Sequence, residues 1–197
     1  MKDTKSYLSK IVQDMPDSGI KDFFDVANTM EGALSLGVGE PDFPTPEHVR
    51  EAAIASIKKG DTKYTDNRGT VELRAAAADY LTKFDLHYDK QDEILITMGA
   101  SEGIDLALRT LVNPGEEVLV AEPSYVSYIP CIELCGGVPV SLKLRAENKF
   151  RLTREQLEEK ITEKSKVLLI SYPNNPTGAI MEKEDLEAIA EVVKEHD

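Results

Sequence analysis

The chain contains 197 residues, 41% of them hydrophobic and 30% charged, a composition typical of globular proteins that excludes the disordered and fibrous classes. With 36 acidic and 23 basic residues its formal charge is -13, so most of its surface would repel a nucleic-acid backbone. No apolar stretch approaches the roughly 18 residues that a membrane span requires. We therefore predict a cytoplasmic protein without nucleic-acid or membrane partners.

The first predicted helix lies near the amino terminus and ends at Gly32, before an apolar segment at residues 33–38. Its apolar residues recur at helical spacing. They are Ile20, Phe23, Phe24, Ala27 and Met30. The chain is thus expected to pass from a helix into a glycine-rich turn.

The next two predicted helices carry signals at their ends. Thr45 and Pro46 provide an N-cap and a first-turn proline, and Gly60 stands where a C-cap glycine is expected. The apolar face of this helix consists of Val49, Ala52, Ala53 and Ile57. A further helix begins near Thr70, and its apolar face is expected to point inward. That face consists of Leu73, Ala76, Ala77, Tyr80 and Leu81.

From Glu93 onward, short apolar runs alternate with amphipathic stretches. Strands are predicted at residues 94–97, 118–121, 138–142 and 167–171. Helices are predicted at 101–112, 124–134, 153–161 and 183–197, the third opening with a capping box between Thr153 and Gln156. This alternation predicts an α/β fold, a mostly parallel sheet flanked by helices, preceded by an N-terminal helical segment. A sheet interrupted after the last helix has an unpaired edge, which predicts low stability for this part alone.

The sequence favours core thiols over a metal site. Cys131 and Cys135 stand four residues apart, which places both on one face of a predicted helix. The three histidines, His48, His87 and His196, are scattered along the chain. We therefore predict buried free cysteines and no bound metal.

Three loops are candidates for ligand binding, because ligands of open α/β sheets collect at the carboxyl ends of the strands. The first, at residues 98–103, runs through small residues directly into a helix. The amides of Ala100, Ser101 and Glu102, with the Ser101 hydroxyl, could bind an anion there. Tight packing alone is the alternative explanation. The glycine patterns of the common nucleotide-binding loops are missing from the sequence.

The other two loops contain an aromatic ring and a constrained amide. Tyr125, after the second strand, could stack on a flat ligand ring, or could simply close the core. The loop at residues 171–178 places two asparagines between prolines. Asn175 could therefore donate a hydrogen bond to a phenolate or carboxylate, although an Asx-type turn without a ligand is also consistent with the pattern.

Five segments together resemble the class I and II aminotransferases of fold type I. They are residues 36–46, 63–65, 99–101, 123–125 and 172–178, in the order and approximate spacing of that family. The most specific are Gly-Glu-Pro-Asp-Phe at 39–43 and Pro-Asn-Asn-Pro-Thr-Gly at 173–178. The resemblance spans essentially the whole chain. It implies the amino-terminal half of an aspartate or aromatic aminotransferase, which moves an amino group to a 2-oxo acid by means of pyridoxal phosphate.

The resemblance also implies roles for individual residues. The cofactor phosphate would lie on Ala100, Ser101 and Glu102, with the ring of Tyr125 stacked on the pyridine. Asn175 would bind the ring oxygen of the cofactor and the substrate carboxylate.

Two further implied roles lie earlier in the chain. The amide of Gly39 would bind the substrate carboxylate. Tyr64 would reach the phosphate in a neighbouring subunit, which implies a homodimer. The resemblance further implies cis peptide bonds before Pro123 and Pro176.

The resemblance assigns residues 1–45 to an N-terminal arm and helix, which contribute to a small domain and the substrate entrance. It assigns residues 46–197 to the first part of the cofactor-binding large domain. The family's Schiff-base lysine and substrate-binding arginine would lie beyond residue 197. We therefore expect no catalytic residue in this chain and no activity from it alone. The alternatives are a carbon-sulfur lyase that uses the same cofactor and fold, and a non-catalytic remnant.

Overall fold

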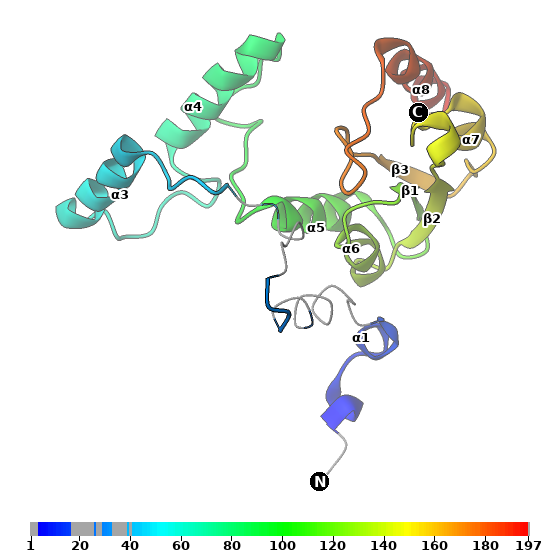
Figure 1. Cartoon of the computed structure of the whole chain (residues 1–197), viewed down its shortest axis with the longest axis horizontal. Coiled ribbons are helices and arrows are strands. Elements are labelled where there is room, and N and C mark those ends of the chain that lie inside the picture. Colours follow the sequence, from blue (N-terminus) through cyan, green and yellow to red (C-terminus); the bar gives the residue numbers. More distant parts are fainter. Residues whose placement is uncertain (1–3, 17–25, 27–28, 33–38, 40, 197) are drawn as a thin grey trace. The chain divides into compact units, whose positions relative to one another are not determined.

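The computed structural model describes residues 4–16, 26, 29–32, 39 and 41–196 (Figure 1). The chain divides into two compact units, which we describe separately: residues 1–17 with 98–197, and residues 18–97. Most of the helix predicted around residues 20–30 lies outside the described residues, as does the apolar segment 33–38. The predicted domain boundary after residue 45 concerns the complete family fold and stays a prediction.

The first unit contains a parallel sheet of three strands, β1 (Glu117–Glu122), β2 (Val138–Lys143) and β3 (Ser165–Leu169). The strand order is β2-β1-β3, and Glu117 of β1 aligns with Val138 of β2. The predicted α/β fold is thereby confirmed. The strand predicted at residues 167–171 corresponds to β3, which begins two residues earlier, at Ser165.

One predicted strand is wrong. Residues 94–97 form no strand, although the amide of Ile96 donates a hydrogen bond to the carbonyl of Arg68 at 3.0 Å. A short apolar run becomes a strand only where another strand can pair with its backbone. Within the described residues this run has no such neighbour.

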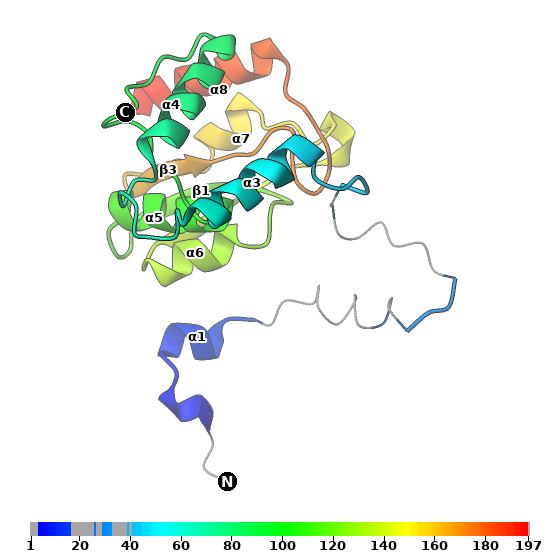
Figure 2. The same cartoon turned by 90° about the vertical axis from the view of Figure 1, so that its left-hand side faces the viewer.

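Helices cover both faces of the sheet (Figure 1 and Figure 2). They are α5 (Ala100–Leu111) and α6 (Tyr128–Leu134) on one face, with α7 (Arg154–Glu158) and α8 (Lys183–His196) on the other. The capping box between Thr153 and Gln156 is confirmed, although α7 is shorter than predicted. The predicted helix at 124–134 is wrong at its start, because residues 124–127 form a loop and turn before α6.

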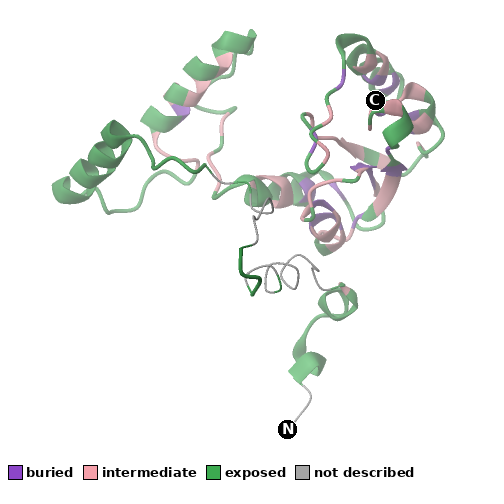
Figure 3. Ribbon diagram, viewed as in Figure 1, coloured by how far each residue is buried: buried purple, intermediate pink, exposed green. Residues whose placement is uncertain are grey.

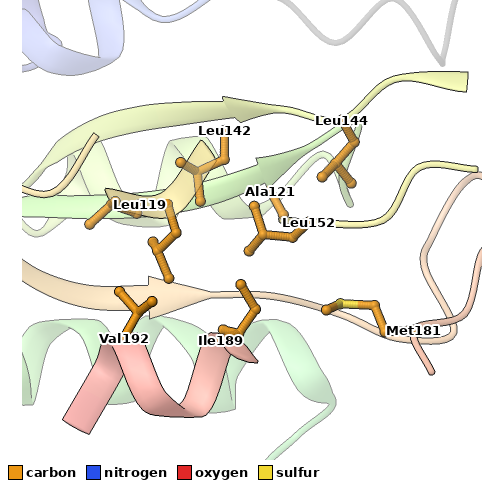
Figure 4. Packing of buried hydrophobic residues seen from close by; sticks show 9 residues of the cluster. Leu119, Ala121, Leu142, Leu144, Leu152, Met181, Ile189 and Val192 are labelled. Carbon is orange, nitrogen blue, oxygen red and sulfur yellow. The ribbon is translucent and has the colours of Figure 1, made fainter. Parts of the chain in front are cut away.

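The central strand β1 is buried on both faces of the sheet. Successive side chains of a strand point to opposite faces, so β1 supplies Leu119 and Ala121 to the cluster beneath α7 and α8 (Figure 4). Val118 and Val120 belong to the cluster beneath α5 and α6. That second cluster also contains Cys131, with Cys135 packed against it, and both cysteines are free. The predicted core thiol is confirmed for Cys131, whereas Cys135 is only partly buried.

The second unit contains α3 (Glu47–Lys59), α4 (Val71–Leu81) and a 3-10 turn at Thr82–Phe84. The predicted end signals hold at Gly60, which caps α3 with φ 84°, and at Thr70, whose hydroxyl accepts a hydrogen bond from the amide of Leu73. Thr45 is not the N-cap as predicted. Pro46 occupies that position and makes no side-chain cap bond, so the first helical residue is Glu47.

Only part of the apolar face predicted for α4 is turned away from solvent (Figure 3). Leu73 is 50% exposed and Tyr80 is 56% exposed. Ala77 and Leu81 are half-buried, and they lie on the same side of the helix as Arg74, which is 1% exposed. Helical spacing determines which residues share a face, but burial requires a second apolar surface against that face.

Of the helices that the structure describes, none combines the length and apolar character needed to cross a bilayer.

Candidate functional site

The candidate site of the first unit begins where the chain enters α5. Gly99 occupies the N-cap position with φ 85°, a backbone conformation that suits glycine, and no side chain caps the first turn. Ala100, Ser101 and Glu102 are all exposed. A helix of 12 residues therefore presents its first-turn amides and the Ser101 hydroxyl to solvent, as an anion site requires.

The carboxylate of Glu102 turns back toward its own chain. It accepts a hydrogen bond from the amide of Met98. A negative charge in the first turn of a helix interacts favourably with the helix dipole, which stabilises the turn. Glu102 can therefore offer an anion its backbone amide, whereas its carboxylate would repel one.

Tyr125 lies beside this turn. Its hydroxyl is 3.5 Å from the hydroxyl of Ser101, and its half-buried ring contacts Tyr128 edge-on at a centroid distance of 5.8 Å. Hydrogen bonding to Ser101 and, second, to Ser127 lowers the pKa of Tyr125, because these bonds favour the phenolate. The tyrosine predicted to stack on a ligand thus lies next to the predicted anion turn.

In the loop at residues 171–178, the two asparagines differ in exposure and in hydrogen bonding. Asn175 is exposed, and no hydrogen bond among those of the described residues involves its side chain. Asn174 is 5% exposed. Its amide nitrogen donates to the carbonyl of Pro123 at 3.2 Å, and its amide oxygen accepts from the backbone and hydroxyl of Thr177 at 3.2 and 2.9 Å.

The sequence pattern assigns no role to Asn174. It predicts for Asn175 either a hydrogen bond to a ligand or an Asx-type turn without one. The side chain that binds its own loop is that of Asn174, which leaves the amide of Asn175 available for a ligand. A distinguishing signal could have been the spacing to Thr177, since an asparagine three residues before a threonine can accept from both its amide and its hydroxyl.

Tyr64 and Gly39 belong to the second unit, so their implied roles stay predictions. Tyr64 is fully exposed, and a Cβ added to Gly39 would meet no atom within 4 Å. The cis bonds predicted before Pro123 and Pro176 are both present, and Tyr172–Pro173 is also cis, which was not predicted. Among the described residues no group of histidine, cysteine and acidic side chains has the arrangement of a metal site.

Comparisons with known proteins identify the family of the chain. The family model "Aminotransferase class I and II" matches residues 31–197. A Bacillus subtilis (strain 168) protein with an aminotransferase name is 49% identical over 98% of this chain and 50% of its own length. Aromatic-amino-acid aminotransferase 2 of Thermococcus litoralis is 44% identical over 96% of this chain and 49% of its own length.

Solved structures give the same result. Aspartate aminotransferase of Thermotoga maritima superposes with a TM-score of 0.91 at 35% identity, over 96% of this chain and 52% of that chain. The chain thus spans about half the length of the relatives it matches, in agreement with the predicted amino-terminal half. It belongs to the class I and II aminotransferase family.

Proposed function

We propose that this chain supplies the phosphate-binding and ring-binding part of a pyridoxal-phosphate site in an aminotransferase. The enzyme would move an amino group from an amino acid of the aspartate or aromatic group to a 2-oxo acid. The observation that carries the proposal is the contact between the first turn of α5 and Tyr125, at the Ser101–Tyr125 distance of 3.5 Å. An anion site next to a flat aromatic ring suits a phosphorylated, planar cofactor.

The described residues fit this cofactor in their chemistry. The exposed amides and hydroxyl at Ser101 are donors for a phosphate. A Cβ added to Gly99 would meet nothing within 4 Å, which leaves space above the turn. Asn175 contributes an exposed amide, a neutral donor suited to an oxygen that carries partial negative charge.

The roles of the chain's own residues follow from these positions. Ser101 and the neighbouring amides would bind the phosphate, and Tyr125 would orient the ring and exclude water from one of its faces. The amide of Asn175 would donate a hydrogen bond to the ring oxygen, which favours the unprotonated form of that oxygen. When bound, pyridoxal phosphate supplies the electron sink that allows a proton to leave the α-carbon of an amino acid.

The covalent and proton-transfer steps would depend on residues outside this chain. We therefore propose that the chain alone is inactive and binds the cofactor weakly and reversibly. We also propose that Tyr64, fully exposed here, binds the phosphate in a second subunit of a homodimer.

Titration of pyridoxal phosphate into the 197-residue chain, followed by borohydride reduction and peptide mass spectrometry, tests this proposal. We expect saturable binding that dilution reverses, no reduced lysine adduct at a defined position and no transfer of amino groups. A stoichiometric adduct on one lysine would show that the chain has its own covalent site and would contradict the proposal.

The phosphate role can be tested at one hydroxyl. Ser101→Ala removes a phosphate donor and should weaken pyridoxal-phosphate binding about tenfold, as expected for one lost hydrogen bond to a charged group. Thr110→Ala is the matched control, because it removes a hydroxyl from the opposite end of α5, where Thr110 donates to the carbonyl of Leu106. Equal losses in the two variants would argue against a site at the start of α5.

The reaction class needs a separate measurement. An aminotransferase gives a 2-oxo acid and a new amino acid, whereas a carbon-sulfur lyase releases a thiol from cysteine-type substrates. Product analysis on a longer protein that contains this chain would separate them, and release of thiol without amino transfer would favour the lyase.

A further inference from the structure

The loop that contains Asn175 is attached to the rest of the first unit by the residue before it. Asn174 is 5% exposed although it lies in a loop with exposed residues on both sides, Pro173 and Asn175. A buried amide is stable only when its polar atoms have partners. Its contacts therefore show what this buried side chain does.

Those contacts join two of the three ligand-binding loops. The amide nitrogen of Asn174 donates to the carbonyl of Pro123, 51 positions earlier in the sequence, at 3.2 Å. Pro123 stands two residues before Tyr125, and Asn174 stands one residue before Asn175. One hydrogen bond thus connects the backbone beside the aromatic ring to the backbone beside the exposed amide.

The rest of Asn174 holds its own loop. Its amide oxygen accepts from the amide and the hydroxyl of Thr177, and its carbonyl accepts from the amide of Gly178 at 2.8 Å. Its backbone amide donates to the carbonyl of Ala179 at 2.8 Å. Because the oxygen already accepts two hydrogen bonds, the side chain is committed to the protein and has little capacity for a ligand.

We propose that Asn174 is a positioning residue, which sets the relative placement of Tyr125 and Asn175 so that both can engage one planar ligand. The inference rests on the proposed function for the nature of that ligand. Asn174 does not touch the ligand itself. Its effect reaches the ligand through the Pro123 carbonyl on one side and the Asn174–Asn175 peptide on the other.

A second anchor of the same loop provides a control. The hydroxyl of Tyr172 donates to the carbonyl of Phe150 at 3.1 Å, a contact that ties the loop to the chain at residues 145–151. Tyr172→Phe removes one hydrogen bond from this loop and keeps the ring. It does not touch the link to Pro123, so it measures the effect of loosening the loop alone.

The first test uses the phenol of Tyr125 and no cofactor. In the parent chain, the hydrogen bond with Ser101 holds the pKa of Tyr125 below its ordinary value of 10.0. If Asn174 positions the Tyr125 loop, Asn174→Ala weakens this contact and the pKa of Tyr125 rises toward that value. NMR titration of tyrosines labelled at Cζ, with Tyr125→Phe to assign the signal, measures it.

Tyr172→Phe should leave the pKa of Tyr125 as in the parent. Asn174→Gln is the second variant in case the alanine variant does not fold, since the added methylene moves the amide away from Pro123 while keeping its polarity. It should raise the pKa of Tyr125 as well. A variant counts as folded when its circular dichroism spectrum matches that of the parent chain. If the pKa of Tyr125 is unchanged in a folded Asn174 variant, the proposal is overturned.

The second test measures pyridoxal-phosphate binding to the same chain by equilibrium titration. Asn174→Ala should weaken binding about tenfold, the equivalent of one hydrogen bond. In a Tyr125→Ala, Asn175→Ala background it should cause almost no further loss, because the groups that it positions are absent. A full tenfold loss in that background would overturn the proposal.

The two tests separate this inference from the proposed function. A Tyr125 pKa that responds to Asn174, in a chain that binds no pyridoxal phosphate, would support the coupling of the two loops and overturn the proposed function. If the chain binds pyridoxal phosphate but the pKa of Tyr125 does not respond to Asn174 variants, the proposed function is supported and the positioning role of Asn174 is overturned.

Discussion

The two units differ in what holds them together. All buried hydrophobic residues of the described chain lie between Leu108 and Val192, in the first unit. In the described part of the second unit, the one buried residue is Arg74. The first unit therefore has an apolar core, whereas the second relies on local hydrogen bonds and helix ends.

The comparison shows that good local signals do not ensure burial. In the second unit, Gly60 ends α3 and Thr70 begins α4, as their residue types predict. Yet Ile54 and Ile57 of α3 are 51% and 68% exposed. Caps need partners within a few residues, while an apolar face needs another element to cover it.

The largest expected effect tests the core of the first unit. Ile132 is 0% exposed, so Ile132→Ala should destabilise this unit by about 2 to 5 kcal/mol. Ile57→Ala, at a position that is 68% exposed, should change stability by about 0.5 kcal/mol or less. Urea unfolding followed by circular dichroism measures both, since the chain has no tryptophan. Similar effects in the two variants would remove the distinction between the units.

A smaller effect is expected at the polar centre of the second unit. The guanidinium of Arg74 donates to the carbonyls of Gly69, Lys90 and Gln91 at 3.2, 2.5 and 2.9 Å. Arg74→Met removes the donor of the Gly69 and Lys90 carbonyls and should cost about 1 to 3 kcal/mol. The Gln91 carbonyl keeps a second donor, the guanidinium of Arg68 at 2.6 Å. Hydrogen exchange should report the loss at the amide of Ile96, which bonds to the neighbouring Arg68 carbonyl.

Arg50→Met is the matched control for Arg74→Met, because Arg50 lies on α3 and is exposed. It should leave the exchange of Ile96 unchanged. If both variants accelerate this exchange equally, Arg74 is not the centre of the second unit.

A third, weaker effect concerns the ion pairs between α7 and α8. Arg154 contacts Glu158 on its own helix at 2.7 Å, and Glu191 and Glu195 on α8 at 3.2 and 2.8 Å. Arg154→Gln should lower the urea midpoint, by less at high salt because ions screen exposed pairs. Lys183→Gln, which breaks a pair within α8, should have a smaller effect. A salt-independent loss would contradict an electrostatic origin.

The smallest effect is a pH dependence at Asp66. A hydrogen bond from the backbone of Arg68, followed by one from its side chain, lowers the pKa of Asp66 below 3.8. The folded state therefore gains stability from this carboxylate above pH 3.8, and loses it as the pH falls through the lower folded value. Exchange at the Gly69 amide, which bonds to the Asp66 carbonyl, should show this acid dependence, and Asp66→Asn should abolish it.

Much of the first unit could be predicted from sequence because its signals are local. The strands β1 and β2 follow from apolar runs, and the Thr153 capping box involves residues only three apart. In the second unit, the strand expected at 94–97 is absent, because a strand also needs a pairing partner that is distant in the sequence. The same reason explains the sheet order β2-β1-β3, which no local pattern encodes.

The candidate site divides in the same way. The sequence indicated Ser101, Tyr125 and Asn175 from loop composition and from the family resemblance. It could not show that Ser101 and Tyr125 lie 3.5 Å apart, nor that Asn174 binds Pro123, since these contacts join segments 24 and 51 positions apart.

The sequence alone therefore determined the fold class, the family and the ends of several helices, which depend on residue types and short spacings. Only the tertiary structure decided which polar side chains are buried, namely Arg74 and Asn174 among the described residues. Burial of these polar groups depends on carbonyl partners supplied by other parts of the chain. Such partners are brought together by folding, and no spacing within a loop or helix specifies them.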